Sequence, residues 1–406
     1  MSMQVALIAI YICVFLIPSV VVDILQYRHI ALALTQRPVI LPRADYIQAG
    51  RYALQKLKIS ISQHFFNALL FAFWILYGLC LVNDFIENYH LPRGKNLNCV
   101  AMILAFILIS QILSIPFKYY TEMILDKRYG FSKQSNQTFV IDLLKGLGMT
   151  IVLGGAVLYL LVYTIYFFEY WWFYGALLSF VVIVLVNFLY PTWIAPLFNT
   201  FTPLKDENLQ ARIEGLLVSV GFKSSGIFIM DASKRDGRLN AYFGGFGKNK
   251  RVVLFDTLLD KVSSDGLIAI LGHELGHFKY KDLLINLLVS GIFLFAVFFV
   301  IGQLPQSFFD ELEIKKNAGN LLILLILLAP VISFWFLPVI GFFSRKAEYR
   351  ADEFGSSLAS KQALAEALIR LVNENKSFPS SHPAYIFFYY THPPLLQRLK
   401  ALDYEF

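Results

Sequence analysis

Long apolar runs, each bounded by polar and basic stretches, dominate the pattern of this 406-residue chain. A helix needs about 20 apolar residues to cross the hydrocarbon core of a bilayer. The first run lacks a basic leading segment and a small-residue cleavage site, so we interpret it as a retained span and not as a signal peptide. The pattern predicts seven membrane-spanning helices, over residues 4–23, 65–86, 99–117, 148–168, 172–195, 283–304 and 320–343.

The composition agrees with a polytopic membrane protein. The chain is 57% hydrophobic and only 16% charged, whereas about a quarter of the residues of a soluble domain are charged. The net charge of +7 requires no nucleic-acid partner, because the basic residues gather on one side of the predicted bilayer. The cysteines argue against a disulfide framework and a cysteine-based zinc site, since they lie in or beside apolar runs without a CxxC spacing: Cys13, Cys80 and Cys99.

Basic residues in the connections between spans predict the orientation of the chain. The positive-inside rule places the first and third connections, residues 196–282 and the C-terminus in the cytoplasm, and the N-terminus on the opposite side. The connections after the second and sixth spans hold only Arg93 with Lys95 and Lys315 with Lys316. Those after the first and third spans hold Arg28, Arg37, Arg43, Arg51, Lys56 and Lys58, and Lys118, Lys127, Arg128, Lys133 and Lys145.

Residues 273–277 read His-Glu-Leu-Gly-His, the pattern of a zinc hydrolase. On a helix, His273 and His277 lie on one face and can bind the same metal ion. Glu274 is offset enough to reach a metal-bound water and act as its general base. Two serines and an aspartate at 263–265 favour the start of such a helix. The competing interpretation is a pair of surface histidines on an ordinary helix.

A third metal ligand must come from elsewhere, and a later glutamate, histidine or aspartate could supply it. The segment 344–352 follows the last predicted span and favours a helix. Its Glu348 and Asp352 share one face, which suits a metal-binding carboxylate and a second carboxylate that orients a ligand histidine. The same segment also fits an exposed helix with Glu–Arg pairs. His382 and His392 both precede a proline, which is common at the start of a helix. The residues alone do not show which of the two histidines lies at the metal site.

Short β-type runs precede the predicted zinc helix. They cover residues 227–230 and 251–255, with 241–243 between them, and 247–250 fits a hairpin turn. A small sheet here could present an edge to which an extended peptide pairs through main-chain hydrogen bonds. Asn240 could equally be a turn residue that satisfies the local backbone.

The His-Glu-Leu-Gly-His helix followed by segment 344–352 resembles the type I CAAX prenyl protease family. Its members are integral-membrane zinc metalloproteases, also called a-factor-converting enzymes. The resemblance extends over nearly the whole chain. Further stretches similar to the family pattern are 115–117, 129–134, 233–235, 240–243, 245–250 and 392–394, with Arg398.

The resemblance implies roles at the metal site. Glu348 would be the third ligand of one zinc ion per chain, beside the two histidines. Asp352 would steady a ligand histidine, and His392 would stabilise the oxyanion of the tetrahedral intermediate. Arg398 would form part of the site wall and orient carboxylates of the zinc helices.

The resemblance also implies how substrate binds. Asn240, Ala241 and Tyr242 would lie on the edge strand that holds the substrate backbone. The family removes the last three residues of a prenylated CAAX peptide, and the seven helices of its members enclose a large water-filled chamber. Residues 236–239 depart from the small polar residues common in the family, which changes the local substrate surface.

We therefore expect an all-α polytopic membrane protein of seven helices with a cytoplasmic, zincin-type α+β metalloprotease domain that contains a small sheet. Residues 196–282 and 344–406 would form this domain, and residues 1–195 and 283–343 the membrane part. The connection 305–319 is short beside eukaryotic members with long insertions there, which favours a bacterial inner membrane over the endoplasmic reticulum.

The predicted function is peptide hydrolysis by a zinc endopeptidase, which we expect to be a monomer. Its partners would be the lipid bilayer and a peptide or protein substrate, prenylated or not, and no nucleic acid. One alternative is a membrane quality-control metalloprotease that degrades unprenylated or damaged membrane proteins. The other is a seven-span transporter or receptor in which the histidine motif is accidental.

Overall fold

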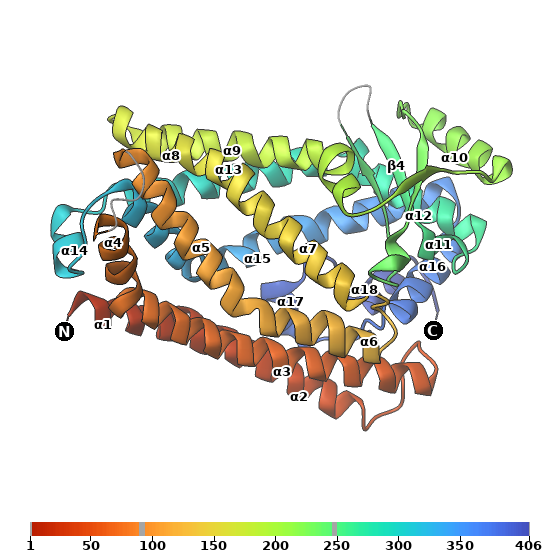
Figure 1. Ribbon diagram of the computed structural model, residues 1–406. Helices are drawn as coiled ribbons and strands as arrows, with labels where there is room; N and C mark the ends of the chain where they lie inside the picture. The colour runs from red at the N-terminus through yellow and green to blue at the C-terminus, as the bar shows by residue number, and fades with distance from the viewer. Residues whose placement is uncertain (1, 89–93, 246–249, 406) are drawn as a thin grey trace.

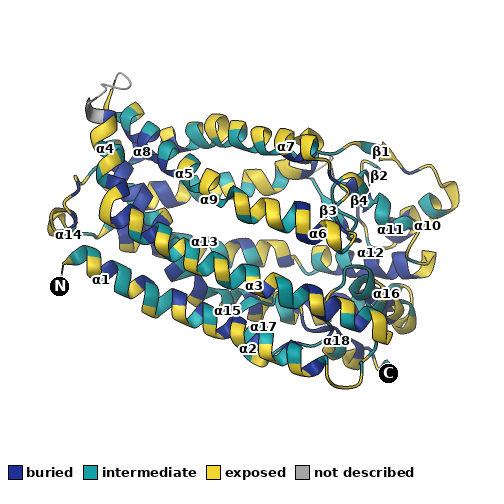
Figure 2. Ribbon diagram, turned by 60° about the horizontal axis from the view of Figure 1, so that its bottom comes forward, coloured by how far each residue is buried: buried dark blue, intermediate teal, exposed yellow. Residues whose placement is uncertain are grey.

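The computed structural model describes residues 2–88, 94–245 and 250–405. Within them, seven helices are long and apolar enough to cross a membrane. Only 11% to 33% of the most apolar stretch of each is buried, and Figure 2 shows exposed positions along all the long helices. Large apolar side chains on the outside of a helical bundle are what contact with lipid requires. The predicted all-α membrane part is therefore confirmed.

The first five spans are long, nearly continuous helices. Single π-helical segments interrupt four of them without ending them. Their bounds are α1 (Met3–Ile10) with α2 (Ile17–Ala33), α3 (Arg43–Phe73) with α4 (Leu79–Asn88), α5 (Lys95–Tyr119) with α6 (Asp126–Arg128), α7 (Asn136–Met149) with α8 (Gly155–Phe167), and α9 (Trp171–Leu189). The last two spans are α13 (Asp282–Gly302) and α15 (Ala318–Leu358), joined through α14 (Gln306–Glu311).

Two helices depart most from the predicted span boundaries. The segment after the first span is helical from Arg43, so Arg51, Lys56 and Lys58 lie on α3 and not in a loop. The seventh span continues to Leu358 without a break. In both places a polar helix extends an apolar one, and hydropathy detects only the apolar part.

The predicted water-filled chamber stays a prediction.

A four-stranded sheet lies at the end of the molecule opposite the N-terminus (Figure 1). Its strand order is β1 (Phe201–Pro203), β2 (Ile227–Met230), β4 (Arg251–Phe255) and β3 (Ala241–Gly244). The strands β2 and β4 are parallel, and the outer pairs are antiparallel. The predicted small sheet is confirmed, with β3 at one edge. The predicted hairpin turn at 247–250 falls mostly outside the described residues.

Short helices complete the protease end. They are α10 (Glu207–Ser219), α11 (Asp256–Leu259), α12 (Ser264–Lys279), α16 (Lys361–Glu374), α17 (Pro383–Tyr389) and α18 (Leu395–Ala401). The core between the sheet and α12 contains Val252, Leu254, Leu258 and Leu271, all fully buried. The segments before the sixth span and after the seventh thus meet in one α+β unit.

Glycines allow α12 and α15 to pack backbone against backbone. A Cβ atom on Gly276 would lie 2.9 Å from the Cα atom of Ala351, and one on Gly355 would lie 2.6 Å from the backbone nitrogen of His273. No side chain fits between helices at such distances. This close approach brings one face of α12 directly against the part of α15 that follows the predicted seventh span. The two predicted ligand segments meet at this contact.

Candidate metal centre

The helix α12 forms as its sequence predicts. The Ser263 hydroxyl accepts a hydrogen bond from the Gly266 N–H at 3.1 Å and caps the helix, with Asp265 in the first turn. His273 and His277 lie in the last two turns, one above the other. A left-handed residue, Lys281 with φ of 57°, then turns the chain into α13. The two histidines are therefore held on a short, well-capped helix.

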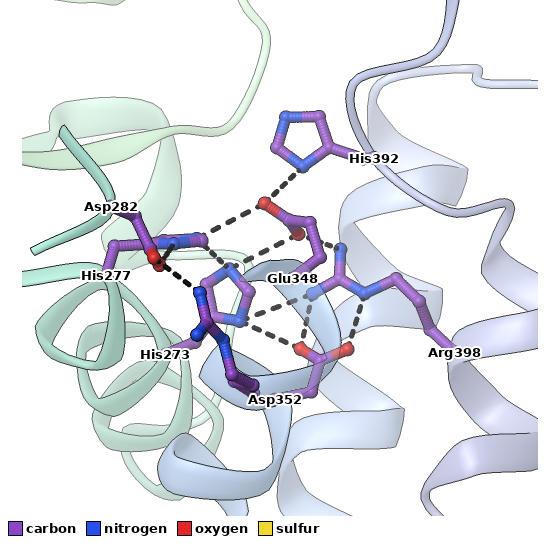
Figure 3. A network of polar contacts seen from close by, with 8 residues as sticks. His273, His277, Asp282, Glu348, Asp352, His392 and Arg398 are labelled. Atoms are coloured by element: carbon purple, nitrogen blue, oxygen red, sulfur yellow. Dashed lines mark hydrogen bonds and ion pairs between the residues drawn. The ribbon is translucent and has the colours of Figure 1, made fainter. Parts of the chain in front are cut away.

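Three predicted ligands converge at one point (Figure 3). One ligand atom from each of His273, His277 and Glu348 lies within 4.8 Å of the others. The two Nε2 atoms are 3.2 Å apart, and Glu348 Oε1 lies 3.2 Å from the Nε2 atom of His277. Glu348 Oε2 lies 3.6 Å from the Nε2 atom of His273.

The hydrogen bonds around the histidines fit a bound cation. The Nδ1–H group of His273 donates to Asp352 Oδ1 at 2.8 Å, and that of His277 donates to Asp282 Oδ2 at 2.9 Å. The two Nε2 atoms then face each other, and two lone pairs at this distance repel unless a metal ion or a proton lies between them. Tetrahedral zinc with Zn–N bonds of about 2.0–2.1 Å places two nitrogens about 3.4 Å apart.

The buried carboxylate of Glu348 supports the same conclusion. Its side chain is 2% exposed, and Oε2 has no hydrogen-bond partner among the described residues. Leaving a buried, charged acceptor unsatisfied costs more than 1–3 kcal/mol, roughly. A metal ion at this point would satisfy it. The donor set of two imidazoles and one carboxylate is that of catalytic zinc sites, which leave a position open.

Arg398 connects the second carboxylate to the cluster. Its guanidinium donates two hydrogen bonds to Asp352, at 2.7 Å and 2.5 Å, and lies 3.5 Å from Glu348. Burial disfavours the charge of Arg398, but the hydrogen bond and charge of Asp352, with the charge of Glu348, raise its pKa. The arginine thus stays charged and holds Asp352 in place against His273.

The structure separates the two proline-preceding histidines. His392 Nδ1 lies 2.8 Å from Glu348 Oε1, and its side chain is 64% exposed, on the open side of the cluster. His382 instead caps α17, where its Nδ1 accepts from the Ala384 N–H, and its own N–H donates to Gln26 of α2. Of the two, only His392 reaches the ligands.

Asp282 is a residue of the site that the sequence pattern did not predict. Its carboxylate accepts from His277 and also from the Arg350 guanidinium at 2.8 Å. Its position gave one signal, an acidic residue at the very start of a membrane span, five residues after a ligand histidine. Periodicity could not reveal the contact, because the turn at Lys281 separates the two helices.

A cavity of about 390 Å³, the metal-site cavity, lies beside the cluster. Its lining includes His273, Glu274 and His392 together with Asn240 and Ala241 at the start of β3. Asn240 is exposed, and its side-chain oxygen accepts from the Ala241 N–H at 2.9 Å. The general-base candidate and the edge strand therefore face one space.

Tyr242, the third predicted substrate-binding residue, is not among the residues that line this cavity. Its ring packs edge-on against Phe255 of β4, and its hydroxyl is buried without a hydrogen-bond partner among the residues that the structure describes. Burial raises the pKa of this hydroxyl to about 12. Tyr242 can therefore contact substrate only through its backbone or beyond this cavity.

Comparison with known proteins gives the family. A family model described as CAAX prenyl protease N-terminal, five membrane helices, matches residues 26–200, and one described as peptidase family M48 matches residues 203–406. CAAX prenyl protease 1 of Saccharomyces cerevisiae is 32% identical over 398 residues, which cover 88% of this chain and 85% of the yeast protein. The chain belongs to the CAAX prenyl protease 1 family.

Two further comparisons agree. The CAAX prenyl protease 1 homolog of Oryza sativa subsp. japonica is 30% identical, and the match covers 94% of this chain and 93% of the rice protein. The crystal structure of S. mikatae Ste24p has a TM-score of 0.90 and 29% identity, and the match covers 100% of both chains. The chain is an M48 membrane metallopeptidase of the CAAX prenyl protease type, and the transporter or receptor alternative is excluded. These relatives are eukaryotic and give no support to the predicted bacterial origin.

Proposed function

We propose that this protein is a zinc endopeptidase that removes the C-terminal three residues of prenylated CAAX proteins, with His273, His277 and Glu348 as zinc ligands. The observation that carries the proposal is the pair of Nε2 atoms 3.2 Å apart, both turned inward by Nδ1 hydrogen bonds to carboxylates. Two imidazoles oriented in this way present both Nε2 atoms to one shared metal ion. The names of the relatives supply the substrate class.

A zinc ion held by His273, His277 and Glu348 would polarise the scissile carbonyl and lower the pKa of a bound water toward neutrality. Glu274 lies on the same helix and lines the same cavity as the ligands. It takes the proton of the attacking water and passes it to the leaving amine. His392 stands on the open side of Glu348 and donates a hydrogen bond to the oxyanion that develops on the substrate.

Asp352, Asp282 and Arg398 position these groups. The two aspartates fix the tautomer and the ring orientation of the ligand histidines, since each accepts an Nδ1–H hydrogen bond. Arg398 holds Asp352 by two hydrogen bonds. The site thus keeps its geometry through contacts that come from α12, α13, α15 and α18.

The edge strand β3 holds the substrate backbone through Asn240, Ala241 and Tyr242. An extended peptide adds to such an edge by main-chain hydrogen bonds. The start of β3 lines the metal-site cavity, so a peptide paired there passes the general base.

The basic residues near the protease end support a cytoplasmic active site, with the N-terminus on the opposite side of the membrane.

The test is cleavage of a farnesylated CAAX peptide by the purified protein in detergent, with the products identified by mass spectrometry. We expect release of the C-terminal tripeptide, at a rate that falls after zinc is removed and returns when zinc is restored. The unprenylated peptide and a denatured membrane protein serve as comparison substrates. If only the denatured protein is cleaved, the proposed CAAX activity is wrong and the protein is a quality-control protease.

A further inference from the structure

A second cavity, of about 470 Å³, lies beside the metal-site cavity, and its charged lining is entirely basic. The walls come from α2, α3 and the residues that follow α16. Among the described residues that line it, Lys56, Arg238 and Lys376 are charged, and none is an aspartate or a glutamate. A cleft lined by one sign of charge between low-dielectric walls concentrates ions of the opposite sign. This basic cavity is therefore suited to an anion.

Two aromatic rings hold the three cations together. The Nζ atom of Lys376 lies 5.1 Å from the centre of the Phe131 ring, and the guanidinium carbon of Arg238 lies 4.2 Å from the same ring. The Nζ atom of Lys56 lies 5.6 Å from the centre of the Tyr52 ring. The charges thus occupy one neighbourhood although they come from distant parts of the sequence.

The three cations differ in their partners. Arg238 is compensated, because its guanidinium contacts Asp236 at 2.6 Å and Asp126 at 3.2 Å. Neither Lys56 nor Lys376 forms an ion pair with any residue in the described ranges 2–88, 94–245 and 250–405. The two ammonium groups therefore carry the charge that remains available to a ligand.

The basic cavity adjoins the metal-site cavity, since Arg238 and Asn375 line both. At this junction the Asn375 side chain takes both main-chain groups of Leu239. It accepts from the Leu239 N–H at 2.7 Å and donates to the Leu239 carbonyl at 3.2 Å. An asparagine side chain thus occupies the place of a pairing strand.

The strand alternation shows what this contact blocks. The Asn240 carbonyl accepts from the Phe255 N–H, so Asn240 faces β4. The main-chain groups of Leu239 and Ala241 then face the free edge, because neighbouring residues of an antiparallel strand alternate. A peptide that pairs with the free edge can do so at the Ala241 carbonyl, since the Ala241 N–H donates to the Asn240 side chain, and it must stop at Leu239, where the basic cavity begins.

The geometry points to the basic cavity as the site that binds the free C-terminal carboxylate of the peptide substrate. An extended chain rises about 3.3 Å per residue, so a carboxylate three residues beyond the scissile bond lies about 10 Å from it. The three residues from Ala241 back to Arg238 span a similar length. A peptide that runs antiparallel to β3 delivers its C-terminus to Lys56 and Lys376. This inference rests on the proposed function and explains the length of the released piece.

The test compares one farnesylated CAAX peptide as the free acid and as the C-terminal amide. We expect the wild-type protein to prefer the acid by roughly ten-fold to one-hundred-fold in kcat/KM, the strength of a charge-assisted hydrogen bond. Lys56→Gln and Lys376→Gln each lower this ratio, and the double variant brings it close to one. Lys58→Gln is the matched control, an exposed lysine of α3 outside the cavity lining, and keeps the wild-type ratio.

Equal cleavage of acid and amide by the wild-type protein overturns the inference and leaves the proposed function intact. If neither peptide is cleaved, the proposed function fails, and the affinities of the protein for the same two peptides then test carboxylate binding in the basic cavity. Equal affinities overturn the inference. A higher affinity for the acid that Lys56→Gln abolishes supports the inference. A lipid phosphate is the other source of an anion. If the lysine variants bind phosphatidylserine vesicles more weakly than the wild type but keep its acid-to-amide ratio of kcat/KM, the inference is also overturned.

Discussion

The Nδ1 atom of His277 lies 2.9 Å from the Oδ2 atom of Asp282, the first residue of the sixth membrane-spanning helix. The other carboxylate oxygen of Asp282 accepts from Arg350 of the seventh span at 2.8 Å. One carboxylate thus connects a candidate metal ligand to both membrane helices of the protease unit. The two last membrane helices therefore take part directly in positioning the metal centre.

Replacing Asp282 by Ala should weaken zinc binding by about ten-fold to one-hundred-fold, because His277 loses the acceptor that fixes its tautomer and orientation. Competition with a chromophoric chelator measures the affinity. Asp265→Ala is the control, since Asp265 lies on the same helix but is exposed and pairs with Arg212 and not with a ligand histidine. Equal zinc affinity of Asp282→Ala and the control would refute the positioning role.

Replacing Glu274 by Gln should lower kcat by roughly 10²–10⁴ while zinc stays bound, because an amide cannot accept the water proton. Rates on the farnesylated peptide and the zinc content of the same samples provide the measurement. Glu366→Gln, an exposed position on α16 outside the metal-site cavity, should behave as the wild type. Retention of the wild-type rate in Glu274→Gln would remove this residue from the mechanism.

Zinc affinity should rise with pH up to about pH 9. Burial disfavours a charged His277, but hydrogen bonds to Glu348 and Asp282 outweigh it and raise the pKa of the metal-free imidazole to about 9. Below that pH the imidazole is protonated, and zinc must displace the proton, so the affinity changes roughly ten-fold per pH unit. Titrations from pH 6.5 to 9.5, with calorimetry in several buffers, measure both the slope and the released proton. A flat profile would contradict this account.

The fold and the site could be predicted from the sequence wherever contacts follow periodicity. A spacing of four places His273 with His277, and Glu348 with Asp352, on single helix faces. The apolar runs likewise predicted the spans, but the polar start of α3 at Arg43 carries no such signal. Within an element, local pattern determines which side chains face together.

Contacts between elements could not be predicted in this way. Asn375 bonds Leu239 across 136 positions, and Asp282 bonds His277 around a left-handed turn. Nothing local distinguishes His392 from His382, since both precede a proline; the difference lies in which helix each segment packs against. Such choices depend on tertiary packing alone.

Gly276→Ala should destabilise the protein by about 1–3 kcal/mol, because the added methyl group meets the backbone of Ala351 at 2.9 Å. Thermal unfolding in detergent measures the loss. Gly215→Ala on α10 is the matched control, since its Cβ would meet no atom within 4 Å, and helix propensity predicts a gain of about 1 kcal/mol there. If both variants unfold like the wild type, α12 and α15 do not pack as described.

The proposed metal centre is tested most directly by the zinc content of the purified protein, measured by inductively coupled plasma mass spectrometry beside Glu348→Ala and Glu366→Ala. The account predicts one zinc ion per wild-type chain, the same content in Glu366→Ala, and a loss of most of the metal in Glu348→Ala, since a buried carboxylate ligand is missing. A wild-type protein that binds no zinc after incubation with it, or a Glu348→Ala variant that keeps the full content, would contradict the proposed centre.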